Sequence, residues 1–353
     1  MCGDHATSGI EARGTLAGSP PRDRPPDATA PFRLGLRNGL LASGLIIGTA
    51  VLLNREDFAA AGRVVRDLPA ALAISALVHV PQIVFTGLAW RALVPPARPS
   101  VASMALLRWT REVANSLLPA GALIGQAAAA RLLARRGVTG DVAGATATVD
   151  LTVEAISQLL FTVTGLGLLI AHDGWSVPAV AVGLVAIVGA AAMILLQRNL
   201  PLRQIEAGMA RLSRRFPAIR PRWIHDFQDK VIRIHARRPA LARALIYHSV
   251  AWTLGAVEIE GVLALLGHPV SFGNALIIES VAQALRNAGF FLPGAIGVQE
   301  VAIVAAAALV GVPPTSALAT ALVRRTREIV FGVAGLAVWR RLESSRRPEG
   351  TVA

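Results

Sequence analysis

The sequence predicts an all-α polytopic membrane protein with about six transmembrane helices, two broken re-entrant helical hairpins and an inverted repeat. Three observations support this prediction: the composition, the long apolar stretches and an internal similarity. Of the 353 residues, 54% are hydrophobic and 16% are charged, against about 25% charged in an ordinary globular domain. The mean hydropathy is +0.54. We therefore expect an integral membrane protein.

The charge balance is strongly basic, with 35 Lys and Arg against 22 Asp and Glu, a net charge of +13. The basic residues lie between apolar stretches and not on one soluble face, so we predict contact with anionic lipid at the cytoplasmic face and no nucleic-acid partner. Cys2 is the sole cysteine, which excludes an intrachain disulfide and a cysteine zinc cluster.

The chain divides into a tail, a transmembrane domain and a second tail. Residues 1–31 are rich in Pro, Ala, Gly and Asp, which predicts a disordered cytoplasmic tail. No cleavable signal peptide is recognisable at the start. We expect the transmembrane domain to cover 32–340 and a short cytoplasmic tail to cover 341–353.

Six stretches have the roughly 20 mainly apolar residues that a helix needs to cross the hydrocarbon core. They are approximately 34–53, 68–94, 142–171, 177–196, 241–266 and 315–339.

Two further apolar stretches are interrupted in the middle. Pro119 breaks the stretch 101–134, and the pair Pro293-Gly294 breaks 273–311. Proline removes an amide donor and clashes with the preceding turn, so each stretch predicts two half-helices. Such breaks are tolerated only inside protein or beside a watery cavity.

Basic residues set the predicted orientation. The segment 197–243, which includes the loop 197–240, carries twelve Arg or Lys against three acids and should be cytoplasmic. Loops 172–176 and 267–272 carry no Arg or Lys and should lie outside. Both termini are then cytoplasmic, and we expect a bacterial inner-membrane protein. Within the basic segment, 203–238 has the pattern of a helix lying on the leaflet; an ordinary basic loop is the alternative.

The chain is similar to itself at an offset of 174 residues. Aligning 118–154 with 292–328 gives 13 identities in 37 positions. Five are Ala on Ala and carry little weight, but the other eight keep the proline break, a Gly-Val pair and the following helix in register. We predict repeat units of about 101–171 and 273–339, with composition bias as the alternative.

The odd number of spans between the two hairpins predicts that the repeat is inverted. Three predicted spans, 142–171, 177–196 and 241–266, separate the first hairpin from the second, so the second enters from the opposite side. Inverted repeats with broken helices are typical of secondary transporters, whose substrate site lies where the breaks meet. The alternative is a pair of hairpins that only fills the bundle.

Ionisable residues inside the spans are costly and by default indicate function. Asp150 and Glu154 form one stripe with Gln158, and Arg286 shares a face with Glu279 and Gln283. The second break is followed by Gln299 and Glu300, and the last span carries Arg324, Arg325, Arg327 and Glu328. Acids and arginines of neighbouring elements should face one another, because a lone buried charge is unfavourable.

The residues that we assign to substrate binding or coupling are Asp150, Glu154, Arg286, Gln299, Glu300, Arg324, Arg325 and Glu328, with Arg324, Arg325 and Arg286 meeting a headgroup or a counter-acid. Glu300 and Glu328 are candidates for gating or proton coupling. Two alternatives remain open: residues 324–328 could be a structural ion-pair network, and Gln299 could satisfy backbone groups freed by Pro293.

Enzyme signatures are weak. The chain has no Gly-x-Ser-x-Gly, His-Glu-x-x-His, Walker or dinucleotide fingerprint, so we expect no catalytic residue and no cofactor. Asp150 and Glu154 could hold a metal, but their Arg neighbours and the lack of an Asp-rich motif favour no metal site.

Two blocks of the sequence resemble the lysylphosphatidylglycerol synthase transmembrane, or flippase-like, family, above all its hopanoid-biosynthesis-associated (HpnL-type) branch. The first block runs from Arg111-Glu112 through Asn115 to Pro119, and continues at Val149 to Glu154. The second runs from Phe290 through Leu292-Pro293-Gly294 to Gln299-Glu300, and continues at Leu322 to Glu328. This resemblance adds Asn115 to the candidate site and marks Pro119, Pro293 and Gly294 as structural breaks.

The first block departs from the family at one position. The family more often has Gly followed by an acid, whereas this chain has Gly125-Gln126. The 174-residue offset pairs these with Gln299-Glu300, so Glu300 becomes the expected ionisable partner.

The resemblance implies movement of a membrane lipid between leaflets, either a hopanoid or an anionic or aminoacylated phospholipid. Two other hypotheses remain. The protein could be a membrane-embedded lipid-headgroup transferase, or a scaffold subunit that binds lipid-biosynthesis enzymes.

Overall fold

The computed structural model describes residues 58–95, 99–118, 121–173, 222–288 and 297–344, with isolated positions at 181, 184 and 188. Within these residues there are nine helices and no strand, which confirms the all-α fold. The tail 1–31, the predicted spans 34–53 and 177–196 and the break residues Pro119, Pro293 and Gly294 lie outside the described residues.

Four long helices cover the other predicted spans. They are α2 (Phe58–Leu93), α5 (Gly140–Asp173), α9 (Arg238–Leu265) and α12 (Pro314–Ser344). At 1.5 Å per residue each is long enough for a hydrocarbon core of about 30 Å. Among the described residues, Arg66–Leu93 and Gly140–Ala171 combine this length with a span-like apolar composition. α9 and α12 are interrupted by charges, which in α12 occupy four of the five positions 324–328.

The two interrupted stretches form helical hairpins, as predicted. α3 (Val101–Leu117) is followed by α4 (Gly121–Ala134), and α10 (Phe272–Ala288) by α11 (Val298–Ala308). Glycines allow α3 and α4 to approach closely: a Cβ on Gly121 would lie 1.9 Å from the Ala114 carbonyl oxygen, and one on Gly125 would lie 2.5 Å from that of Arg111.

The helices repeat at the same 174-residue offset as the sequence. α3, α4 and α5 correspond to α10, α11 and α12, and the register extends to α2 and α9. Packing follows the same symmetry, because α3 contacts α12 where α10 contacts α5, and α2 packs against α9. The turns before α5 and α12 both use a glycine at positive φ, Gly137 (88°) and Gly311 (77°), a conformation that glycine adopts readily.

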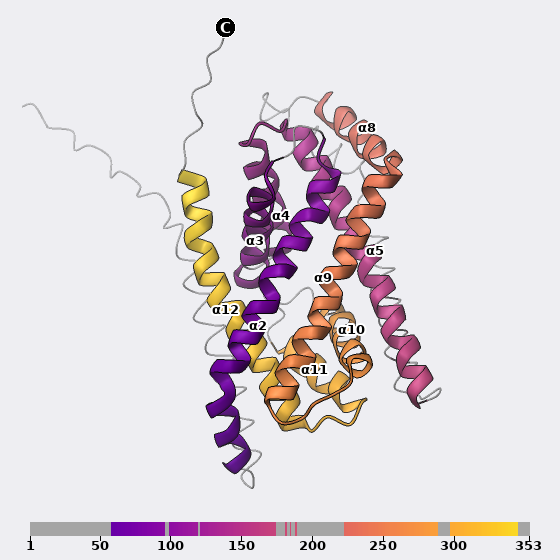
Figure 1. Ribbon diagram of the computed structural model, residues 1–353. Coiled ribbons are helices and arrows are strands. Elements are labelled where there is room, and N and C mark those ends of the chain that lie inside the picture. The colour runs from indigo at the N-terminus through magenta and orange to yellow at the C-terminus, as the bar shows by residue number, and fades with distance from the viewer. Residues whose placement is uncertain are drawn as a thin grey trace, which may run out of the picture.

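Figure 1 shows that the repeat is inverted: the hairpin α3–α4 lies in the upper half of the molecule and α10–α11 in the lower half. α2 and α12 rise through the bundle in this view, while α5 and α9 descend. The two hairpins therefore enter the bundle from opposite ends.

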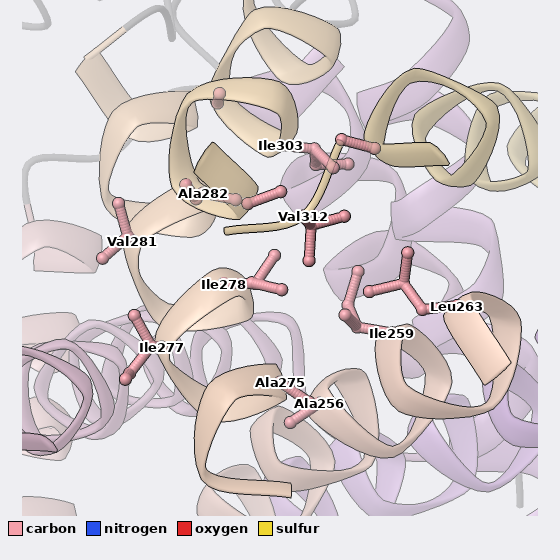
Figure 2. Close-up of a cluster of buried hydrophobic side chains, with 14 of the residues drawn as sticks. Ala256, Ile259, Leu263, Ala275, Ile277, Ile278, Val281, Ala282, Ile303 and Val312 are labelled. Atoms are coloured by element: carbon pink, nitrogen blue, oxygen red, sulfur yellow. The ribbon is translucent and has the colours of Figure 1, made fainter. Parts of the chain in front are cut away.

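Each hairpin has its own apolar core, and the two cores use equivalent positions. In the second core, Figure 2 shows Ile278 of α10 facing Val312 and Ile259 of α9. Seven buried residues of the first core, Met104, Leu107, Ala129, Leu132, Leu133, Ala143 and Ala147, align 174 residues later with Ile278, Val281, Ile303, Ala306, Ala307, Ala317 and Ala321 of the second.

The basic segment 197–243 contributes one described helix, α8 (Arg222–Ala236). α8 packs against α5, with Ile234 buried, while Ile232 and Arg233 are exposed. Lys230 pairs with Asp141 at the start of α5. Figure 1 places α8 at the same end of the bundle as the C-terminal ends of α2, α4 and α12, each of which carries arginine in its last turn.

The close packing of α3 against α12 predicts that alanine substitutions at two glycines differ in their effect on stability. A Cβ on Gly335 of α12 would lie 2.4 Å from Cγ2 of Val113, whereas nothing lies within 4 Å of one on Gly167 of α5. We expect Gly335→Ala to lower the free energy of unfolding by about 1–3 kcal/mol. The matched change Gly167→Ala should be neutral or stabilise by up to about 1 kcal/mol. Thermal unfolding in detergent measures both, and equal stability of the two variants would contradict this packing.

Candidate functional site

A first buried charge network joins α3 to α5. Arg108 and Arg111 lie one turn apart on α3, and Asp150 and Glu154 lie one turn apart on α5, so each pair shares a helix face. Arg111 contacts Glu154 at 2.6 Å and Asp150 at 3.2 Å. Arg108 pairs with Glu154 and lies 3.5 Å from Asp150. Nε2 of His248, on α9, is 3.0 Å from the other Asp150 oxygen.

A second network surrounds the arginines of α12. Arg324 lies 2.6 Å from Glu279 of α10 and 3.4 Å from Glu258 of α9. Arg327 pairs with the same Glu258 at 2.7 Å. The hydroxyl of Ser75, on α2, donates a hydrogen bond of 2.6 Å to Glu258. Four helices therefore meet at one buried group of charges.

The second network continues to the N-terminus of α11. Arg325 contacts Glu300 at 2.7 Å and Glu328 at 3.1 Å. Glu300 also accepts a hydrogen bond of 2.9 Å from the amide of Gly297, so it caps the helix that follows the second break and complements its dipole. The side-chain amide of Gln299 donates to Glu328 at 2.9 Å. Gln299 thus serves the ion-pair network.

A histidine–glutamate pair lies between the two networks. Nε2 of His79, on α2, is 2.8 Å from a carboxylate oxygen of Glu112 on α3. Nδ1 of the same ring is 2.8 Å from the side-chain oxygen of Gln82. The ring packs edge-on against Phe331 of α12, with centroids 5.1 Å apart.

Two pairs of equivalent positions in and beside the networks carry opposite charges, although the equivalent Glu154 and Glu328 are both acidic. Asp150 of α5 corresponds to Arg324 of α12, and Glu112 of α3 corresponds to Arg286 of α10. In the first unit the hairpin carries the arginines and the long helix the acids. In the second, the hairpin residue Glu279 meets an arginine of the long helix. The inverted fold therefore holds two different charge arrangements.

The structure brings most of the predicted site residues together. Asp150 and Glu154 lie in the first network, while Gln299, Glu300, Arg324, Arg325 and Glu328 lie in the second. Arg286 is half-buried and close enough to Glu328 to act on it electrostatically. Asn115 is exposed and contributes to neither network. Gln126 donates a hydrogen bond to the carbonyl of Ala147.

Seven of the network residues were not among the predicted site residues: Ser75, Arg108, Arg111, His248, Glu258, Glu279 and Arg327. The spacing of Arg108 and Arg111, three apart in an apolar stretch, was the signal that could have found those two. His248 and Glu258 carry no such local signal, because their partners are 98 and 66 to 69 residues away.

These networks hold charge and hydrogen-bond donors but no grouping of ligands for a metal. Within the described residues, no three His, Cys, Asp or Glu side chains are placed to bind one ion. In the second network, Nε of Arg324 and Nε of Arg327 are buried and have no hydrogen-bond partner in the described part of the chain. The second network therefore holds two unsatisfied N–H donors.

We expect substitution of Glu258 to cause the largest loss of stability in the second network. Glu258→Gln removes the carboxylate that pairs with Arg327, and an unpaired buried charge costs about 3–5 kcal/mol. Replacing both partners by methionine should recover most of that loss. As a control, Glu343→Gln breaks the partly exposed contacts with Arg131 and Arg135 and should cost about 0–1 kcal/mol. Thermal unfolding in detergent tests this order, and a smaller loss for Glu258→Gln than for Glu343→Gln would contradict it.

Comparison with known families agrees with the resemblance seen in the sequence. The family model described as the lysylphosphatidylglycerol synthase TM region matches residues 39–335. This range includes both hairpins and both charge networks. No curated protein matches the chain, and no solved structure does. The protein is an all-α membrane protein that belongs to the lysylphosphatidylglycerol synthase transmembrane family.

Proposed function

We propose that the protein is a lipid flippase or transporter of the bacterial inner membrane. The observation that supports this most strongly is a pair of buried charge networks, one on each of two inverted hairpins. Transporters with inverted repeats bind substrate where the broken helices meet and expose that site alternately to the two sides. The family is a membrane family related to lipid metabolism or transport, which favours a lipid as the substrate.

The distribution of polar and apolar side chains fits a lipid. The charges lie inside the bundle, with Asp150 and Glu258 each 1% exposed or less. Large apolar side chains such as Leu77, Val163 and Val330 lie on the outside. A lipid could pass its headgroup along the interior charges while its chains stay in the surrounding hydrocarbon.

The second network fits an anionic headgroup. The buried Nε donors of Arg324 and Arg327 are without a hydrogen-bond partner in the described part of the chain. Guanidinium groups bind phosphate and carboxylate oxygens with strong, charge-assisted hydrogen bonds. We therefore favour a phospholipid, anionic or aminoacylated, as the substrate. A hopanoid is the substrate that the HpnL-type resemblance suggests.

The direct test reconstitutes the purified protein in liposomes with a labelled phospholipid or a hopanoid and follows leaflet exposure over time. We expect movement with the wild type and a loss of it in the double variant Arg324→Ala/Glu300→Gln, because both changes leave a buried partner uncompensated. Arg341→Ala, on the same helix but near its C-terminal end, is the control and should move lipid like the wild type.

Two outcomes would contradict the transporter. Wild-type protein that moves no lipid in either direction would overturn it. Time-dependent chemical conversion of the lipid would instead support the transferase hypothesis. A Glu300→Gln variant that folds and transports normally would exclude coupling through Glu300.

The predicted orientation has its own test, because Cys2 is the sole cysteine. If the N-terminus is cytoplasmic, a membrane-impermeant maleimide should label Cys2 only after the inner membrane is permeabilised. In a Cys2→Ser background, His268→Cys in the loop after α9 should be labelled from the outside without permeabilisation. The reverse labelling pattern would overturn the positive-inside assignment.

A further inference from the structure

His79 occupies an unusual place between the two networks. It is 5% exposed, and it lies on α2 two residues before Pro81, which cannot donate the helix hydrogen bond to the carbonyl of Leu77. Both ring nitrogens lie 2.8 Å from side-chain oxygens, one from Glu112 and one from Gln82. The imidazole is therefore held on both sides inside the bundle.

This setting accommodates both protonation states of the ring. An imidazolium carries an N–H on both nitrogens, and a carboxylate oxygen of Glu112 lies 2.8 Å from Nε2 while the side-chain oxygen of Gln82 lies 2.8 Å from Nδ1. A neutral ring donates from one nitrogen and accepts at the other. Gln82 can serve that state as well, because rotating its side-chain amide presents NH₂ in place of oxygen. A ring that has lost a proton can therefore keep its hydrogen bond to Gln82 at Nδ1.

Glu112 differs from the acids of the two networks. Each of those acids lies within ion-pair distance of at least one arginine. The close contact of Glu112 is His79, and no arginine in the described part of the chain lies within ion-pair distance of it. Its side chain is 32% exposed, against 7% for that of His79, so Glu112 is the member of the pair nearer the surface.

The charged groups around this pair come from three other elements. Arg108 of α3 and Arg327 of α12 lie close enough to Glu112 to interact with it electrostatically. Glu258 of α9 lies close enough to His79 for the same kind of interaction. Glu154 of α5 is linked to this pair indirectly, because it forms an ion pair with Arg108. The pair thus connects the first network to the second.

We propose that His79 and Glu112 form a proton-binding site that couples lipid movement to a proton gradient. This inference rests on the proposed transport function. A proton taken up from water through the Glu112 carboxylate resides on the imidazole, and its release returns it to water by the same carboxylate. When the ring loses the proton, Glu112 loses its countercharge, and Arg327 is the next cation able to supply one.

The consequence is a competition between the two repeat units. Arg327 of the second unit pairs with Glu258 at 2.7 Å in the structure. Without a charge on His79, Glu112 of the first unit attracts Arg327. Protonation thereby changes the attraction between α3 and α12, two helices that pack through close glycine contacts at Gly332 and Gly335.

The experiment imposes a pH gradient on proteoliposomes, with the membrane potential clamped, and measures how a labelled phospholipid divides between leaflets. Wild-type protein should drive the lipid away from an even distribution, and a protonophore should abolish this accumulation. His79→Gln and Glu112→Gln should lose the accumulation and let the lipid spread evenly. His235→Gln changes an exposed histidine on α8 and should accumulate lipid like the wild type.

Three other outcomes would each overturn a stated part of the proposal. Wild-type protein that spreads lipid evenly under the gradient would leave the transport function intact and overturn proton coupling. Accumulation by His79→Gln equal to that of the wild type would overturn the assignment of the site. Wild-type protein that moves no lipid would overturn the transport function, and coupling with it.

A second measurement tests the proton site without any lipid. The Trp109 indole donates to the carbonyl of Phe331, whose ring packs against His79. An imidazolium quenches tryptophan fluorescence, so the difference in fluorescence intensity between the wild type and Trp109→Phe should change when the pH is lowered enough to protonate the ring. His79→Gln should remove this change. The same transition in His79→Gln protein would contradict a proton on His79.

Discussion

An unpaired charge is unfavourable in an apolar interior, and this constraint determines how the helices of the protein are arranged. A buried carboxylate or guanidinium that loses its partner destabilises the fold by several kcal/mol. Asp150 must therefore lie beside α3, and Glu258 beside α12, which fixes the rotation of four helices at once. Apolar packing fills the remaining space, but a smooth apolar helix surface would permit many rotations.

The inverted repeat gives these charges a special relationship. One backbone arrangement is used twice, and the two hairpins face opposite ends of the bundle (Figure 1). Asp150 and Arg324 occupy equivalent positions and carry opposite charges, whereas the equivalent Glu154 and Glu328 are both acidic. The two units are therefore alike in shape and differ in charge. In the transporter that we propose, they exchange between two arrangements, and a ligand or a proton that binds one of them better shifts the balance.

Much of the fold could be predicted from the sequence because it depends on local patterns. Proline breaks, apolar stretch lengths and the Gly-Val pairs at 137 and 311 each leave a signal within a few residues. The extension of the repeat to α2 and α9 leaves no comparable identity, because those helices share shape and packing but few residues. The partners of Glu258 and His248 lie on distant helices, and side-chain pairing over that separation depends on tertiary geometry that a single sequence does not encode locally.

The central claim is that the buried charges conduct a lipid headgroup and are more than structural supports. The double variant Glu258→Met/Arg327→Met separates these roles, since it removes the charges while keeping the helix contacts filled. Lipid movement in liposomes, measured beside thermal unfolding, is the most direct test. The account predicts a folded double variant that no longer moves lipid. A folded double variant that moves lipid at the wild-type rate would show that this part of the network only stabilises the fold.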